Sequence, residues 1–213
     1  MDKRIKNVCE FYAITHRLKN LIRAGQTTWA IERERFESVA EHVYGSQMLA
    51  LAIHSEFDLK LDLKKVALMI AIHELGECVI GDLGDTGCPI SKEEKARLEL
   101  EAVQKIFAGI SNAGELLELF AQFEERKTDE AKFAYLVEKI ECDFEFKYNE
   151  EMGYADEKRV TNKSAKEMLL KHKKYGCRTL VEGFIEHDRR NIFGDDKIFN
   201  AIAEYLLKNK VFN

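Results

Sequence analysis

The sequence predicts an all-α protein. Only one proline and 12 glycines occur in 213 residues, so few positions can interrupt a helix. No long run alternates apolar and polar residues, as a half-buried strand would. Hydrophobic residues make up 46% of the chain and charged residues 33%, which is typical of a globular protein and excludes a disordered one. We therefore expect one helical domain over residues 1–213.

Apolar spacing and capping residues place the helices in order. The first helix is expected over residues 2–23. Ser38 followed by Glu41 matches a capping box and opens the second helix. Asp62 can cap a third, strongly apolar helix, and Ser91 begins a second capping box. The expected helices span residues 2–23, 38–57, 62–80, 91–107, 113–125, 128 or 129 onward, 161–175, 178–187 and 195–208.

Charge and cysteine usage exclude several classes of protein. Thirty-three basic against 38 acidic residues give a net charge of −5, so the chain lacks the basic field expected of a protein that binds a nucleic-acid polymer. The longest apolar runs, such as residues 66–72, are too short to cross a bilayer, and no signal peptide is expected. The five cysteines are scattered and form no CxxC pair, which indicates reduced thiols in the cytoplasm.

The apolar helix expected over residues 62–80 carries three groups that need partners. Buried charge is costly unless it is paired or binds a metal. Glu77 lies four residues from His73 and three from Glu74, so the three side chains share one face of the helix. A zincin would need a second histidine at position 77, which excludes that class. A buried histidine that is simply hydrogen-bonded to a carboxylate stays open as the alternative.

His42 strengthens the metal interpretation. It lies in the first turns of the helix that Ser38 opens, where a lone histidine is usually an ordinary surface residue. Together with His73 and Glu74, it supplies two imidazoles and a carboxylate from two helices. Such a set suits a Mn, Fe, Co, Ni or Zn ion.

At these segments the chain resembles the HD-domain metal-dependent phosphohydrolases, closest to their 5′-deoxynucleotidase branch. The resemblance rests on ESVAEH, on HELGECVIGDL, on SKEEKARLELEA and on TDEAKFAYLVEKIE, in that order. It implies an H…HD…D signature on an α-helical bundle, with glutamate in place of aspartate at Glu74 and Glu138. It places a divalent ion, Mn, Co, Fe, Ni, Zn or Mg, on His42, His73, Glu74 and Glu138. Glu141 and Asp143 are the fallback ligands if the register of this helix differs. Without the resemblance, Glu138 would be taken for a solvent-facing residue.

The resemblance also implies roles around the metal. The ion would activate water and neutralise charge on a phosphate. Glu77 is the candidate for proton transfer, and Asp82 for a contact to the leaving group or sugar, although a turn residue would look the same. Arg33 and Arg35 offer guanidinium groups for phosphate oxygens, or form a solvated mixed-charge segment. Trp29 either walls the nucleoside pocket or anchors its loop.

The function predicted is hydrolysis of (deoxy)nucleoside 5′-monophosphates by a cytoplasmic, metal-dependent phosphohydrolase, with a homodimer expected from the resemblance. Two alternatives stay open: an HD hydrolase of another phosphomonoester or phosphodiester, and a degenerate module that binds a nucleotide or a protein without turnover. The literal His187-Asp188 dipeptide fits no family context and is interpreted as a solvated helix end. Lys92 and Lys95 are interpreted as ordinary residues of a capped helix.

Overall fold

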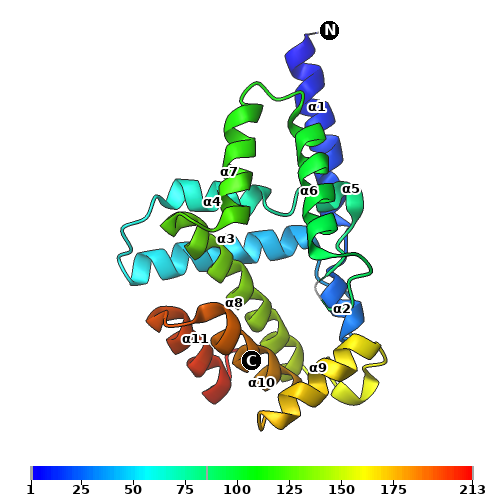
Figure 1. Ribbon diagram of the computed structural model, residues 1–213, viewed down its shortest axis with the longest axis vertical. Coiled ribbons are helices and arrows are strands. Elements are labelled where there is room, and N and C mark those ends of the chain that lie inside the picture. Colours follow the sequence, from blue (N-terminus) through cyan, green and yellow to red (C-terminus); the bar gives the residue numbers. More distant parts are fainter. Residues whose placement is uncertain (1, 85, 213) are drawn as a thin grey trace. The chain divides into compact units, whose positions relative to one another are not determined.

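The structure is a computed structural model that describes residues 2–84 and 86–212 (Figure 1). Every named element within these ranges is helical, apart from a single isolated bridge between Ile22 and Ser38, which confirms the all-α class. In the part of the chain described, no helix is both long and apolar enough to cross a bilayer.

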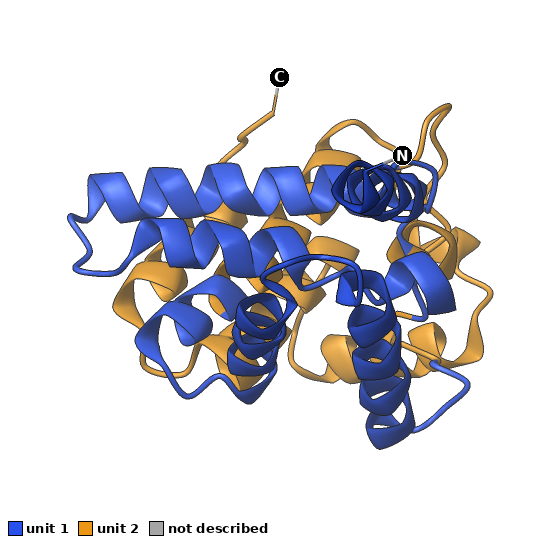
Figure 2. Cartoon of the chain, turned by 90° about the horizontal axis from the view of Figure 1, so that it is seen from above, with its two compact units in different colours: residues 1–23, 37–83, 88–135 blue, residues 24–36, 84–87, 136–213 orange. Residues whose placement is uncertain are grey.

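The contacts of the chain cluster into two compact units, coloured separately in Figure 2. Unit 1 comprises residues 1–23, 37–83 and 88–135, and unit 2 comprises residues 24–36, 84–87 and 136–213. The prediction of a single domain over residues 1–213 did not anticipate this division. Each unit is described by itself below.

Unit 1 holds the N-terminal helices and carries three of the four proposed metal ligands, His42, His73 and Glu74. Two of its helices, α3 and α4, run side by side in opposite directions (Figure 1). The elements are α1 (Lys3–Thr15), the 3₁₀ helix η1 (His16–Lys19), α3 (Val39–Glu56), α4 (Leu63–Ile72), α5 (Glu77–Ile80), α6 (Lys92–Phe107), α7 (Ala113–Glu125) and the first turns of α8 (Asp129–Glu151).

The predicted helix starts in unit 1 are largely confirmed. The capping box at Ser38 is complete, because the Ser38 side chain accepts from the Glu41 backbone while the Glu41 carboxylate accepts from the Ser38 backbone. The Asp62 side chain accepts from the first backbone N–H groups of α4. At Ser91 the hydroxyl accepts from the Glu94 backbone, but the Glu94 carboxylate binds Arg97 instead of reaching back.

The helix predicted over residues 2–23 is shorter than expected. It tightens into η1 and ends at Lys19. Its continuation pairs with the segment that precedes α3: the Arg23 N–H donates to the Glu37 carbonyl at 3.1 Å, and the Val39 N–H donates to the Leu21 carbonyl at 2.8 Å. These long-range bonds, around the bridge between Ile22 and Ser38, replace the helical ones.

The prediction of one helix over residues 62–80 is wrong. Helix α4 ends at Ile72, a turn occupies residues 73–76, and the short α5 follows. Within this turn the backbone bonds join residues three apart, as from Leu75 to Ile72 and from Glu77 to Glu74. Gly76 allows α6 to pack closely against this turn, because a Cβ added to it would lie 3.0 Å from the Cα of Glu99 in α6. The close approach of α6 therefore accompanies the tighter turn.

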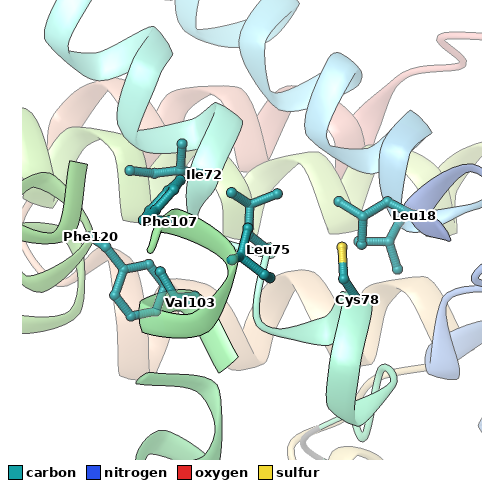
Figure 3. Packing of buried hydrophobic residues seen from close by; sticks show 9 residues of the cluster. Leu18, Ile72, Leu75, Cys78, Val103, Phe107 and Phe120 are labelled. Atoms are coloured by element: carbon teal, nitrogen blue, oxygen red, sulfur yellow. The ribbon is translucent and has the colours of Figure 1, made fainter. Parts of the chain in front are cut away.

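A hydrophobic cluster in unit 1 packs against this turn. Figure 3 shows Leu18 of η1 facing Cys78 of α5, with Leu75 of the turn beside them. Burying such side chains stabilises the fold by about 1.5–3 kcal/mol each. The elements next to the proposed ligands are thus fixed by the core. Its buried members are Leu18, Val39, Ile72, Leu75, Cys78, Val103, Ile106, Phe107 and Phe120.

Unit 2 packs around a second, aromatic-rich core. Trp29 is 3% exposed and makes edge-to-face contacts with Phe146 and Phe184, at 6.4 and 4.6 Å between ring centroids. Apart from the later turns of α8, the elements are α2 (Ala24–Thr28), the 3₁₀ helix η2 (Glu157–Arg159), α9 (Lys163–Lys174), α10 (Leu180–Asp188), the π-helical turn η3 (Arg189–Phe193) and α11 (Lys197–Lys208).

Several apolar residues near the C-terminus pack inside unit 2. Phe193, Phe199 and Leu206 are buried, and Tyr205 is exposed. The expected homodimer stays a prediction.

Candidate metal centre

His42 lies on the first turns of α3, as the capping box predicted. The helix start fixes its backbone, and the imidazole is completely buried. A surface location, which a lone histidine near a helix start would normally have, is therefore ruled out for His42.

His73 occupies the residue after α4, where the helix gives way to the turn. Its Nδ1 lies 2.7 Å from the Ile70 carbonyl oxygen, so Nδ1 donates to that oxygen, and in the neutral ring the lone pair is on Nε2. Among the described residues, no group forms a hydrogen bond with His73 Nε2, although this atom is buried. A buried, oriented lone pair of this kind suits a metal ligand.

The two imidazoles converge on the Glu74 carboxylate. Glu74 Oε1 lies 3.6 Å from His73 Nε2 and 3.9 Å from His42 Nε2, and the two rings are 5.8 Å apart between centroids. Each of the three residues offers a ligand atom within 4.8 Å of the others. Two nitrogen donors and one oxygen donor at this spacing fit a transition-metal ion or Zn²⁺.

Burial raises the pKa of the Glu74 carboxyl, but the charge of His73, in its protonated form, and that of the Arg23 guanidinium outweigh that effect. His42 and Lys95 add to the lowering, and the pKa falls to about 2. Glu74 is therefore ionised at neutral pH, as a metal ligand has to be.

The pKa of the Glu77 carboxyl shifts in the opposite direction, upward. Burial raises its pKa, the negative charges of Glu74 and Asp82 raise it further, and it reaches about 11. Its Oε2 atom is buried and has no hydrogen-bond partner in the part of the chain described. At neutral pH this carboxyl is protonated and can donate a proton.

Arg23 belongs to this centre, although the sequence analysis did not select it. Its NH1 atom lies 3.0 Å from Glu74 Oε1 and 3.7 Å from Asp82 Oδ2. The arginine thus brings Asp82 into the same cluster. No local pattern marks Arg23, because its partner Glu74 is 51 residues away in the sequence.

A cavity of about 310 Å³ adjoins Glu77 within unit 1. Polar groups of η1 and the following residues form one side, and the Arg17 guanidinium donates to the Cys78 carbonyl at 3.2 Å. The lining residues are His16, Arg17, Asn20, Leu21, Glu77, Cys78 and Gly81.

Comparison with known proteins now places the chain in a family. A family model described as HD domain matches residues 15–182. The chain belongs to the HD-domain family. His42, His73 and Glu74 lie within the matched residues.

Curated relatives of this HD-domain chain carry the name 5′-deoxynucleotidase. It is 31% identical over 144 residues to 5′-deoxynucleotidase HDDC2 of Dictyostelium discoideum, covering 64% of this chain and 74% of that protein. It is 31% identical over 156 residues to 5′-deoxynucleotidase hdd1 of Schizosaccharomyces pombe, covering 68% and 76%. For the human HDDC2 protein the values are 28% identity over 138 residues, 64% and 65%, so the match spans just under two thirds of that relative.

Solved structures confirm the HD-type helical fold. A conserved hypothetical protein from Pyrococcus furiosus has a TM-score of 0.67 at 18% identity, with 94% of this chain and 99% of that chain covered. A protein described as a predicted metal-dependent phosphohydrolase, from Magnetospirillum magnetotacticum, has a TM-score of 0.63 at 21% identity and covers 97% and 94%. An HD-domain phosphohydrolase from Listeria innocua has a TM-score of 0.57 at 15% identity and covers 94% and 96%.

Glu138, the last ligand implied by the HD-domain resemblance, lies on α8 three residues beyond the part of that helix assigned to unit 1. It is buried, 6% exposed, and its carboxylate pairs with Lys139 at 3.2 Å. The solvent-facing position that its sequence context suggested is therefore wrong. The fallback candidates Glu141 and Asp143 are buried as well, so burial does not choose among the three.

The three residues proposed to bind substrate all lie in unit 2. Trp29 is part of its core, as the anchoring interpretation expected. Arg33 NH1 donates to Glu145 at 2.7 Å and to Asn149 at 3.0 Å. Arg33 and Arg35 also line a second cavity of about 740 Å³, together with Glu32, Glu34, Tyr148 and Tyr154.

Proposed function

We propose that this HD-domain chain hydrolyses deoxynucleoside 5′-monophosphates to nucleoside and phosphate with a divalent metal ion. The observation that carries the proposal is the juxtaposition of two imidazoles and the Glu74 carboxylate with a second buried carboxyl at Glu77. The names of the curated relatives support the choice of a 5′-deoxynucleotide as substrate.

His42, His73 and Glu74 would hold the ion, and we propose Glu138 as the fourth ligand. When bound, a divalent ion lowers the pKa of water and neutralises charge on phosphoryl oxygens. Support for Glu138 comes from its burial and from the match of its helix to the last ligand segment of the family. The donor set suits Mn, Fe, Co, Ni or Zn, and Mg stays among the candidates.

The chain's own residues supply charge and a proton. Arg23 holds the Glu74 carboxylate in place and links it to Asp82. As water adds to phosphorus and the bond to the 5′ oxygen breaks, Glu77 donates its proton to that oxygen, and the nucleoside leaves as a neutral alcohol. Such positioned acid catalysis contributes about 10²–10⁴-fold to the rate.

We assign the departing nucleoside to the cavity beside Glu77. The proton donor lines this cavity, so a leaving group that takes the proton would project into it. Asn20, His16 and Arg17 offer hydrogen-bonding groups and a flat guanidinium for a base. Deoxyribose 5-phosphate, which has no base, should therefore be a poorer substrate than the nucleotides.

The roles predicted for Arg33, Arg35 and Trp29 stay predictions. The bonds of Arg33 to Glu145 and Asn149 show that its guanidinium is already engaged inside unit 2. Arg35 is then the better candidate of the two for a phosphate contact. A cytoplasmic location and a homodimer are likewise proposed on the basis of the sequence alone.

The test is phosphate release from a panel of substrates with Mn²⁺, Co²⁺, Mg²⁺ or chelator. The panel contains deoxy- and ribonucleoside 5′-monophosphates, deoxyribose 5-phosphate and a cyclic nucleotide. Metal-dependent release, fastest with deoxynucleoside monophosphates, is expected. Release from the cyclic nucleotide alone would assign a phosphodiesterase, and inertness under every condition would refute hydrolysis.

The second candidate function, a module that binds nucleotide without turnover, is favoured by the glutamate that stands at position 74 in place of the family's aspartate. It predicts that the protein binds metal and nucleotide but releases no phosphate. The Glu74→Asp variant separates the two functions, since a gain of activity from zero would support the module.

A further inference from the structure

Helix α6 packs through Glu99 against Gly76, in the turn that carries His73 and Glu74. A Cβ placed on this glycine would lie 3.0 Å from the Glu99 Cα and 3.1 Å from its Cβ and Cγ, tighter than normal side chains allow. The turn that carries His73 and Glu74 therefore rests directly on the backbone of α6. Residues on this face of α6 are neighbours of the proposed metal centre.

Lys95 lies one turn before Glu99 on that face. Its Nζ is 3.7 Å from Glu99 Oε1, and the two side chains are only 21% and 18% exposed. Lys92, by contrast, is an exposed residue at the first position of α6. The two lysines, which look alike in the sequence, thus have different environments.

The charge of Lys95 reaches the centre. Its ammonium group interacts electrostatically with the side chains of Glu74 and Glu77. The cluster contains three carboxyl groups, at Glu74, Glu77 and Asp82, while its arginine is occupied by two of them. A dianionic phosphate that enters such a site needs a cation besides the metal ion and Arg23.

We propose that Lys95 is a substrate-binding residue whose ammonium group contacts the phosphate of the nucleotide. The proposal rests on the proposed function of the same centre. Glu99 acts as a positioning residue, because its carboxylate holds the lysine against α6 until the phosphate arrives. A lysine suits this task, since it presents a compact charge with three donors.

The experiment compares Lys95→Met with Lys92→Met as the matched control on the same helix. The affinity of the Mn²⁺-loaded protein for inorganic phosphate is measured by calorimetry, and Mn²⁺ affinity by electron paramagnetic resonance. We expect Lys95→Met to weaken phosphate binding by about 10- to 150-fold, the range of a charge-assisted hydrogen bond, and to raise KM for the nucleotide in parallel. Mn²⁺ affinity should change less than about threefold, and Lys95→Arg should recover most of the phosphate affinity.

Unchanged phosphate affinity in a folded Lys95→Met protein would overturn the proposal. A fall in kcat with unchanged KM and phosphate affinity would also overturn it, because the lysine would then act only through the carboxylates. If Lys95→Met does not fold, Lys95→Gln and Lys95→Arg are compared by the same two measurements. The proposed function has its own test: it is refuted if the wild-type protein hydrolyses no nucleotide. The comparison of phosphate affinities does not depend on turnover, so the two failures can be told apart.

Discussion

Two histidine-acid dipeptides at helix ends have opposite surroundings in this protein. His73-Glu74 follows α4 in unit 1, and His187-Asp188 closes α10 in unit 2. Glu74 lies among Arg23 and two imidazoles, and its pKa is about 2. Asp188 lies near a second carboxyl, Asp143, whose pKa burial and the charge of Asp188 raise well above its ordinary value.

The histidines of the two dipeptides, His73 and His187, also have different surroundings. His73 keeps a buried lone pair directed at a carboxylate. His187 instead lies 6.2 Å from the ring of His172, and burial, followed by neighbouring positive charge, lowers the pKa of both. The dipeptide in unit 1 can therefore bind a cation, whereas the one in unit 2 lies beside a second buried carboxyl, Asp143, and a histidine, His172, whose pKa is lowered. The charges around each dipeptide, more than its residue types, distinguish a metal-ligand motif from a chance histidine-acid pair.

The largest effect is expected from a paired substitution of the two histidines. His73→Ala removes an imidazole ligand, so metal-dependent phosphate release should be abolished. His187→Ala should leave kcat/KM within about threefold, since surface and peripheral changes rarely alter a distant site. Phosphate release assayed with saturating Mn²⁺ measures both, and similar losses in the two variants would erase the distinction between the dipeptides.

Glu77→Gln should reduce kcat by about 10²–10⁴-fold, because the amide cannot donate an acidic proton. Mn²⁺ affinity should remain close to that of the wild-type protein. Glu93→Gln, an exposed change at the start of α6, is the control. An unaltered kcat in Glu77→Gln would remove Glu77 from the reaction and leave only the metal ligands.

Asp143→Asn tests the electrostatics of unit 2. Because the folded-state pKa of Asp143 is raised, the contribution of this carboxyl to wild-type stability is greatest below the unfolded pKa, near 4, and falls as pH rises toward the folded value. The loss amounts to at most about 1.4 kcal/mol per pH unit, or about 2–4 °C in Tm for each kcal/mol. Asp143→Asn should therefore melt higher than wild type at pH 8 and much the same at pH 4. Equal destabilisation at both values would mean that the carboxyl is satisfied when ionised.

The smallest effect is expected from Glu74→Asp, which restores the aspartate of the family signature. The shorter side chain keeps the charge and the oxygen donors, so kcat/KM should stay within about tenfold. Steady-state kinetics with Mn²⁺ and Co²⁺ measure the change. A loss as large as that of His73→Ala would show that the extra methylene of Glu74 is needed to reach the ion.

Short-range sequence patterns predicted helix starts and several residues of the candidate site. The capping residues Ser38 and Asp62 define helix starts through bonds to backbone groups two or three residues away, and such bonds can be inferred from sequence. His73 and Glu74 were selected because buried charge demands partners, and His42 because it adds a second imidazole from another helix. The structure brings these three together.

The remaining features depend on contacts distant in the sequence. Helix α4 ends at Ile72, next to the turn where α6 approaches Gly76. The sequence of neither helix predicts this end. Arg23 and Lys95 gain their roles only from neighbours brought near by folding. The interpretation of His187-Asp188 as a solvated helix end was wrong for the same reason, since Asp188 is buried.

The central claim is that the histidines and Glu74 of unit 1 bind one divalent ion. Counting bound Mn²⁺ by electron paramagnetic resonance, in metal-stripped protein titrated with the ion, tests it most directly. We predict one tightly bound ion per chain in the wild-type and His187→Ala proteins and none in His42→Ala or His73→Ala. Full occupancy in either of the latter two variants would contradict the account.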